Sequence, residues 1–244
     1  MARFKQNTEG IRIVRRTAYE IKQYRRWMKI IPIAISVLAL FVVVSYVVAA
    51  LYSKYGAYTV LVNKYDHVKF ALTLSETPDF EKPTVRLNSK ANQDITNISV
   101  KDLPQDLDNI NGEHNGDNYV AYTYYLKNAG ISSVNAEYML YIANMTQNIE
   151  KAVRVRLYVN GEYVDYARTR SDGSGPEPNT TEFLTETIIV RKQLTDFKPE
   201  DVTKFTVVIW LEGDDPDCVD SVIGGQFKID MAISVISSAE ESEV

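Results

Sequence analysis

The longest apolar run in the chain covers residues 30–51 and reads IIPIAISVLALFVVVSYVVAAL, with no charged residue. A helix needs roughly 20 apolar residues to cross the hydrocarbon core of a bilayer, and a single segment in that core satisfies its backbone hydrogen bonds only as a helix. Pro32 lies in the first turn, where the missing N–H matters least. The run therefore predicts one transmembrane helix. The alternative is a buried core helix, but such helices seldom run this long without a polar face.

After residue 51 the period of the pattern changes to two, which is typical of half-buried strands. The clearest example is residues 152–159, where valine and leucine alternate with Arg154 and Arg156. Asn160 and Gly161 follow, and an Asn-Gly pair between two such runs predicts a β-hairpin because both turn residues need positive φ. Similar alternating or apolar runs predict short strands over residues 67–74, 83–87, 95–100, 119–127, 134–142, 163–170, 183–190, 203–211 and 227–235.

Many short strands without a long helix predict an all-β domain over residues 52–236, built as an antiparallel β-sandwich of jelly-roll or Greek-key type. Residues 203–211 are largely apolar, so we expect a central strand that is buried on both faces. Residues 101–118 and 171–181 are rich in Asn, Asp, Gly and Ser and predict loops. Residues 237–244 are acidic, and we expect a disordered tail there.

Charge is distributed unevenly along the chain. Residues 1–29 hold nine Lys/Arg against two Asp/Glu, whereas residues 52–244 hold 18 Lys/Arg against 30 Asp/Glu. Cationic residues close to a span stay on the cytoplasmic side, so we expect the N-terminus inside the cell and residues 52–244 outside. Residues 1–29 are expected to be a cytoplasmic basic segment, amphipathic over 8–29, that lies on the inner leaflet or docks to a cytoplasmic partner. Small residues at 48–50 would allow signal-peptidase cleavage, but the apolar run exceeds a signal peptide's length, so we expect an uncleaved anchor.

The most unusual polar stretch is residues 212–220, EGDDPDCVD, which directly follows the expected central strand. A hard cation such as Ca²⁺ takes six to eight oxygen ligands, so this loop is a candidate Ca²⁺ site, and Ca²⁺ is the one cofactor that the sequence suggests. The alternative is a solvated turn whose aspartates bond to the backbone. The candidate ligands are Glu212, Asp214, Asp215, Asp217 and Asp220.

No sequence signal supports catalysis, so we expect that the chain is not an enzyme. Cys218 is the single cysteine, and its acidic neighbours disfavour a reactive thiolate. The two histidines, His67 and His114, are far apart in sequence, and the chain has no zinc-hydrolase, serine-hydrolase or phosphate-loop motif. The acidic excess of residues 52–244 also disfavours nucleic acid as a partner.

The order of these features resembles a known family. A hydrophobic N-terminal segment leads into a short strand, YVAYTYYLKNAGISSVNAEYMLYIAN follows at residues 119–144, and GGQFKIDMAISV closes the domain at 224–235. In layout, residues 40–236 are similar to the TasA/camelysin group of bacterial surface and biofilm-matrix proteins. WLEGDDPDC at 210–218 also resembles a phrase in uncharacterised membrane-anchored proteins of Firmicutes. The resemblance implies a jelly-roll domain with an extracellular structural role, and fibre growth by strand exchange in some members. The long anchor and basic tail depart from that family and weigh against free fibre assembly.

These observations predict a single-pass membrane protein that displays a β-sandwich outside the cell as a structural or adhesive surface protein. Its expected partners are the membrane and other surface or matrix components or its own copies. The alternative is a ligand- or cation-sensing ectodomain that signals through the basic segment, and a hydrolase is a third, weaker alternative. Residues 52–66 also alternate, and we expect them to pair within their own chain as the first strand.

Overall fold

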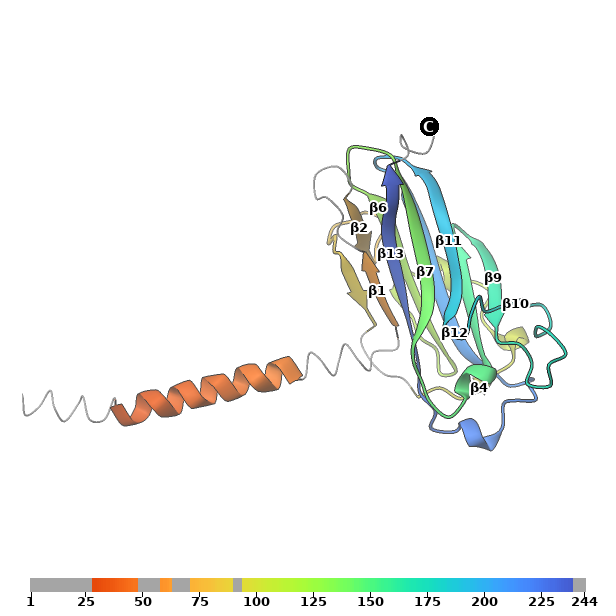
Figure 1. The fold of residues 1–244 in the computed structure, drawn as a ribbon, viewed down its shortest axis with the longest axis horizontal. Coiled ribbons are helices and arrows are strands. Elements are labelled where there is room, and N and C mark those ends of the chain that lie inside the picture. Colours follow the sequence, from red (N-terminus) through yellow and green to blue (C-terminus); the bar gives the residue numbers. More distant parts are fainter. Residues whose placement is uncertain (1–27, 48–57, 63–70, 90–93, 239–244) are drawn as a thin grey trace, which may run out of the picture. The chain divides into compact units, whose positions relative to one another are not determined.

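The chain divides into two compact units, Met1–Lys54 and Tyr55–Val244, which are treated separately. The helix Met28–Val47 belongs to the first unit, and all strands belong to the second (Figure 1). The computed structural model describes residues 28–47, 58–62, 71–89 and 94–238.

The helix Met28–Val47 confirms the long apolar helix over the residues that the structure describes. It has 20 residues, which at a rise of 1.5 Å give about 30 Å, the thickness of the hydrocarbon core. Its side chains are exposed along its whole length, whereas a core helix would be mostly covered. Its length and composition therefore suit a membrane span or a signal sequence. The predicted basic segment up to residue 27 and residues 48–51 of the predicted span lie outside the described residues.

The second unit is mostly β-structure, in two sheets. The five-stranded sheet has the order β11-β7-β13-β1-β3. The eight-stranded sheet has the order β10-β9-β8-β12-β6-β2, with β4 beside β12 and β5 beside β6. The strands are β1 Tyr58–Val62, β2 Leu72–Ser75, β3 Arg86–Asn88, β4 Asn97–Ile98, β5 Gly112–Glu113, β6 Tyr119–Asn128, β7 Val134–Met145, β8 Val153–Val159, β9 Glu162–Ala167, β10 Thr181–Glu182, β11 Ile188–Phe197, β12 Val202–Glu212 and β13 Phe227–Ser238. Short 3-10 helices connect them at η1 Val100–Asp102, η2 Leu107–Asn109, η3 Ile149–Lys151 and η4 Asp220–Val222.

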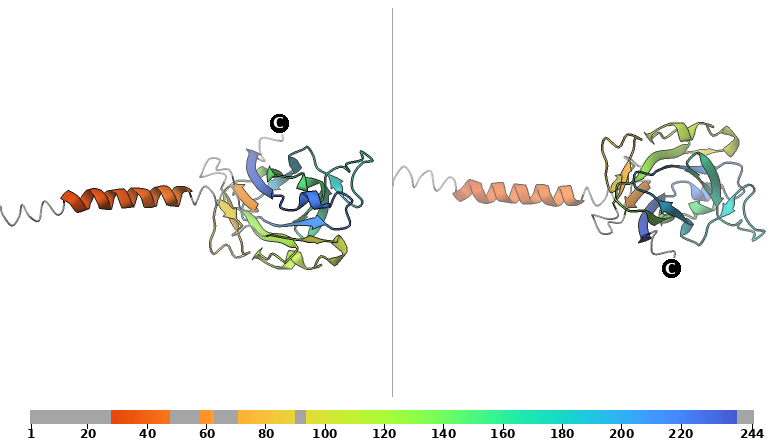
Figure 2. Two further views of the ribbon diagram at one scale, coloured as in Figure 1. Left: turned by 90° about the horizontal axis from the view of Figure 1, so that it is seen from below. Right: turned by 90° about the horizontal axis from the view of Figure 1, so that it is seen from above.

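One hydrophobic core is shared by both sheets. Alternate residues of β7 are buried, as the period of two requires. Tyr138 of β7 packs edge-on against Phe205 of β12, with 5.2 Å between ring centres. The Tyr124 hydroxyl of β6 donates to Met231 Sδ of β13 at 2.6 Å. Both contacts join strands of different sheets. Figure 1 shows the long strands running along the domain, and Figure 2 views them nearly end-on.

The predicted purely antiparallel arrangement is wrong for three strand pairs. β1 runs parallel to β13, β4 parallel to β12, and β10 parallel to β9. Strands joined by a tight turn must be antiparallel, whereas strands separated by a dozen or more residues can pair in either direction. All three parallel pairs join strands with long intervening segments. The alternation of residues shows which face is buried, but it carries no information on the partner of such strands.

β12 is the central strand that the apolar residues 203–211 predict. It lies between β8 and β6, and its residues are buried on both faces. The main core covers one face. The segment 101–118, which we predicted as a polar loop, covers part of the other face, because its residues Leu103 and Leu107 are buried against Trp210. This segment therefore packs against the eight-stranded sheet through two buried leucine side chains.

The predicted hairpin at Asn160-Gly161 is confirmed. Both residues have positive φ, 52° and 92°, and Val159 pairs with Glu162 across the turn. Five other predicted strands are also present, and their observed bounds differ from the predicted ones by at most three residues. They are the strands predicted over 119–127, 134–142, 152–159, 163–170 and 227–235. β13 continues to Ser238, two residues into the predicted tail; residues 239–244 lie outside the described residues.

The strand predicted over residues 183–190 is displaced. The observed β11 begins at Ile188 and ends at Phe197, and Phe183 is a buried core residue outside any strand. β11 lies at the edge of its sheet, and its outer positions include exposed Arg191 and Lys192. Charged residues on an edge strand are a common protection against unwanted pairing, and they weaken the apolar alternation by which a strand is predicted. The strands predicted over 83–87 and 95–100 are also shorter than expected, and residues 67–70 lie outside the described residues.

Candidate functional site

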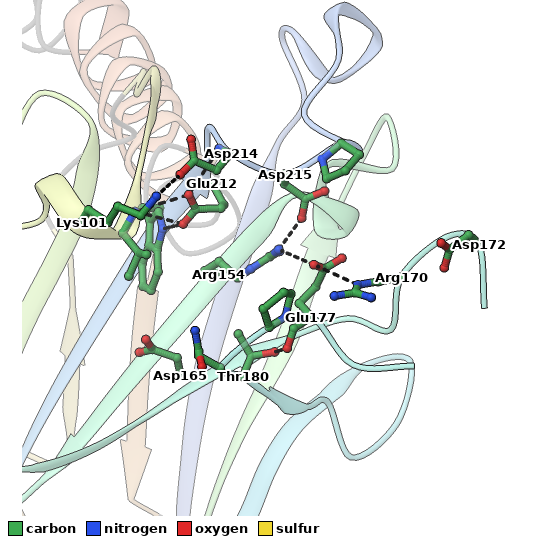
Figure 3. A pocket seen from close by; sticks show the side chains of 15 residues that line it. Lys101, Arg154, Asp165, Arg170, Asp172, Glu177, Thr180, Glu212, Asp214 and Asp215 are labelled. Carbon is green, nitrogen blue, oxygen red and sulfur yellow. Dashed lines mark hydrogen bonds and ion pairs between the residues drawn. The ribbon is translucent and has the colours of Figure 1, made fainter. Parts of the chain in front are cut away.

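The structure separates the five acidic residues of the predicted Ca²⁺ site. Glu212, Asp214 and Asp215 line a pocket of about 560 Å³ (Figure 3). Asp220 lies in η4 and lines a different pocket. Asp217 lies between Asp215 and Asp220 in the sequence, and one of its carboxylate oxygens lies within 4.8 Å of an Asp215 oxygen. The loop after β12 therefore does not bring all five carboxylates to one point.

Glu212 is a buried carboxylate that anchors the end of β12. Its Oε2 accepts a hydrogen bond from Trp210 Nε1 at 2.9 Å. Its two oxygens also accept the Val100 N–H, at 3.1 and 3.3 Å, and Oε1 accepts the Asp214 N–H at 3.3 Å. A buried carboxylate needs such donors, and here they all come from the protein. Glu212 thus joins β12 to the start of η1.

Asp214 lies at the exposed rim of the same pocket. Ser99 Oγ donates to its Oδ2 at 2.9 Å, and Lys101 Nζ donates to the same oxygen at 3.2 Å. The hydrogen bond from Ser99, followed by that from Lys101, holds the pKa of Asp214 below its ordinary value. Asp214 therefore carries a negative charge at the rim under physiological conditions.

Arg154 is the centre of the pocket's buried charge. Its side chain is 5% exposed. Its Nη2 donates to Asp215 Oδ2, and the same nitrogen lies 3.3 Å from Glu177 Oε2. Arg170 Nε lies 3.6 Å from that Glu177 oxygen. Because buried charges are stable only when paired, this cluster holds together β8, the loop after β12 and the loop before β10, as Figure 3 shows.

Glu177 has a perturbed ionisation equilibrium. Burial raises its pKa above the ordinary value, and the negative charge of Asp215 raises it further, while Arg154 and Arg170 partly offset both effects. Two carboxylates that share one guanidinium disfavour each other's charge. The charge of Glu177 therefore depends on the cations and carboxylates around it.

Three carboxylates of this region could contribute ligands to a metal ion. Glu177, Asp215 and Asp217 each place one oxygen within 4.8 Å of the others. Ca²⁺ takes six to eight oxygens, but Arg154 already pairs with two of these carboxylates, and Asp215 Oδ1 accepts the Asp217 N–H at 2.7 Å. The arrangement fits a guanidinium better than Ca²⁺. These three carboxylates alone offer fewer oxygen ligands than Ca²⁺ takes. Ca²⁺ binding by this loop therefore stays a prediction.

Sequence reasoning missed Arg154 and Glu177 as members of the site. Arg154 lies on the outer face of β8, as the alternation indicates, but the loop before β10 buries it. The available signal was the pair of arginines in an otherwise apolar strand. The second, Arg156, is buried as well, and its Nε and Nη2 donate to the two Asp165 oxygens at 2.6 and 2.8 Å. Burial alone would lower the pKa of Arg156, but its hydrogen bonds to Asp165 and Tyr158 raise the pKa above its ordinary value.

Most of the residues that line the pocket are charged, and carboxylates outnumber cations. Its walls come from the segments around η1, β8, the loop before β10 and the loop after β12. Such a surface attracts ammonium and guanidinium groups of a partner. The charged residues that line it are six carboxylates, Asp165, Asp172, Glu177, Glu212, Asp214 and Asp215, and three cations, Lys101, Arg154 and Arg170.

Cys218 and the histidines do not meet in the part of the chain that the structure describes. Asn97 Nδ2 lies 3.6 Å from Cys218 Sγ, and the thiol lines the second, apolar pocket. His114 contacts the Gly112 carbonyl through Nδ1 at 2.8 Å. His67 lies outside the described residues.

No family model matches the chain, and no curated protein matches it significantly. Four solved chains match, and two of them are crystal structures of a β-glucosidase from Kluyveromyces marxianus. The complex with glucose is 13% identical, with 70% of this chain and 16% of that chain covered and a TM-score of 0.25. The selenomethionine-labelled form is 12% identical, with 66% and 17% covered and a TM-score of 0.25. The chain thus matches about a sixth of those proteins, and a TM-score of this size carries no argument about function.

Proposed function

We propose that this chain is a single-pass membrane protein whose second unit is displayed outside the cell as a structural or adhesive surface domain. The observation that carries the proposal is the exposed apolar helix Met28–Val47, followed after about ten residues by β1 of the β-rich unit. The excess of Lys and Arg before the helix supports the inside location of the N-terminus. A short connection of this kind suits a domain that works close to the cell surface.

We also infer that the second unit is a β-sandwich of jelly-roll or Greek-key type. Successive strands change sheets: β6 lies in the eight-stranded sheet, β7 in the five-stranded sheet and β8 in the eight-stranded sheet again. The series β11, β12 and β13 repeats this change. Such connections, with one core shared by the two sheets, support the sandwich. They leave loops at both ends of the domain for recognition.

The charged pocket is the surface that we propose for partner contact. Its rim carries Asp214 and Asp172, which are exposed, so a partner that presents lysine or arginine side chains complements it. Surface or matrix proteins with basic segments fit this description. Copies of the same acidic domain repel one another in solution, although confinement in one bilayer raises their effective concentration.

The test combines topology with partner capture. Protease added to intact cells should degrade the second unit and spare the N-terminal segment, and protection of the second unit would overturn the proposed orientation. The full-length chain in mild detergent should then capture basic surface proteins. The substitution Asp214→Asn should lower capture several-fold, whereas Asp196→Asn should not; both carboxylates have side chains that are 60% exposed. Equal capture by both variants would remove the pocket from the proposal.

A second candidate function is a ligand- or cation-sensing ectodomain. The observation that favours it is the buried cluster in which Glu177 and Asp215 share Arg154, because a cation bound by these two carboxylates would displace the guanidinium and release Arg154. A ligand that binds only the folded state raises the unfolding temperature. A rise in Tm with Ca²⁺, reversed by a chelator and absent in Glu177→Gln, would support sensing. No change in Tm would exclude Ca²⁺ as the ligand.

A further inference from the structure

A second pocket, of about 690 Å³, opens at one end of the hydrophobic core. Val120 and Ile209 of the eight-stranded sheet and Phe227 of the five-stranded sheet are among its walls. Its lining also includes Val219 and Ile223, which are 53% and 73% exposed and therefore lie at its mouth. The volume falls in the range of roughly 300–1,000 Å³ that is typical of ligand sites. An apolar pocket with an apolar mouth favours an apolar occupant over water.

This pocket lies at the end of the domain where the chain arrives from the helix. β13 begins at Phe227, and β1 runs parallel to it with Tyr58 opposite Ile229. Paired strands lie about 4.8 Å apart, so the first residue of β1 is close to the pocket wall. In Figure 1, β13 runs toward the end marked C, and Phe227, which lines the pocket, is the first residue of β13.

The connecting chain between the helix and β1 is short. Residues 48–57 separate the helix from β1, and ten residues span at most about 36 Å when fully extended. The opposite end of the domain lies beyond the 12 residues of β13, which is about 40 Å further along the strand. Of the two ends of the domain, the end with the apolar pocket is the one where the connection from the helix enters β1.

We propose that this pocket binds an acyl chain of a lipid from the bilayer in which the protein is anchored. The inference rests on the proposed anchoring and adds a ligand to it. Val219 and Ile223 contact the apolar part of the bilayer surface, and the acyl chain enters between the two sheets. Asp94 and Asp220 also line the pocket, and their negative charges disfavour an anionic headgroup at the mouth. A neutral or zwitterionic lipid is the preferred ligand.

The experiment uses the full-length chain in phosphatidylcholine vesicles that contain a phosphatidylcholine with a photoreactive group in its acyl chain. After irradiation, mass spectrometry measures the label on three peptides: the helix, the pocket segment around Phe227, and the segment around Ile131. Ile131 is also 73% exposed but lies in the β6–β7 connection at the opposite end of the domain. We expect label on the helix and the pocket segment, with little on the Ile131 segment.

The substitution Ile223→Asp should lower label in the pocket segment at least five-fold relative to label in the helix, and Ile131→Asp should leave the ratio unchanged. Replacing half of the unlabelled phosphatidylcholine with phosphatidylglycerol should not lower pocket label relative to helix label, because the pocket disfavours the anionic headgroup, and a fall would contradict that headgroup preference. Label on the helix but not on the pocket overturns the lipid inference alone, whereas no label on the helix overturns the anchoring itself. Ile223-dependent cross-links between two chains, without lipid label, would assign the pocket to a second copy instead.

Discussion

Replacing Arg154 with alanine removes the cation from the middle of the buried cluster. Its partners Asp215 and Glu177 have side chains that are 0% and 6% exposed. Removing one partner of a buried ion pair leaves an uncompensated charge and destabilises a protein by about 3–5 kcal/mol. In a protein of this size, 1 kcal/mol shifts Tm by about 2–4 °C. We therefore expect Arg154→Ala to lower Tm by roughly 6–20 °C.

Arg170→Ala is the matched control for this substitution. Arg170 approaches the same Glu177 oxygen, at 3.6 Å, but its side chain is 37% exposed. Exposed ion pairs contribute about 0–1 kcal/mol, so we expect a shift of at most about 4 °C. Thermal unfolding of the full-length chain in detergent measures both variants, and the fluorescence of Trp210, which is buried beside the pocket, reports the loss of structure.

The pH dependence distinguishes loss of charge pairing from loss of packing. Arg154 partly offsets the raised pKa of Glu177, so without Arg154 the folded state binds a proton on Glu177 still more readily than the unfolded state does. The variant therefore loses stability as the pH rises. The deficit relative to wild type should therefore be smaller at pH 4 than at pH 7. A deficit that is the same at both pH values, or that does not exceed that of Arg170→Ala, would refute the electrostatic reasoning.

Three further predictions concern Glu177, Cys218 and β1. The pKa of Glu177 is raised above its ordinary 4.5, so the contribution of Glu177 to wild-type stability falls as the pH rises from about 4.5 through the folded-state pKa. Glu177→Gln should remove this fall, which denaturant titrations at successive pH values measure. Cys218→Ser should change the free energy of unfolding by less than about 1 kcal/mol, because the thiol is only partly buried, and loss of partner capture by a folded variant would contradict its inert role. Deleting residues 58–62 removes the fully buried Val60 and exposes one edge of β13, so sedimentation should show aggregation; a stable monomer would show that β1 is dispensable.

The β-rich unit was predictable because most of its strands have one buried and one outer face. β7 shows this pattern, β8 alternates in the sequence although its arginines are buried as well, and β12 is recognisable because most of its residues are apolar. Pairing was not predictable for β1, β4 and β10, because alternation fixes the buried face of a strand and leaves its neighbour open. The displaced β11 shows a second limit, since an edge strand protected by charge resembles a loop in its composition.

The acidic stretch 212–220 indicated the correct loop but not its partners. Asp215 is paired with Arg154, which lies 61 residues away in the sequence, and Glu177 reaches the same guanidinium from a loop that looked flexible. Such contacts depend on which loops meet at the end of the domain, and no local pattern encodes that. A buried arginine in an apolar strand was the one local sign that a carboxylate must cover it.

The position of β1 bears on how the protein could assemble. The prediction that the segment after the span pairs within its own chain is confirmed for residues 58–62, which pair with β13 on one side and β3 on the other. Donation of this strand to a neighbour would break both ladders and expose the pocket of Val60, which is 0% exposed at present. It would also pull the domain toward a second anchor, because β1 is joined to the helix by only about ten residues. Assembly of copies by donation of β1 is therefore disfavoured, and a partner would have to bind a surface that stays exposed while β1 is in place.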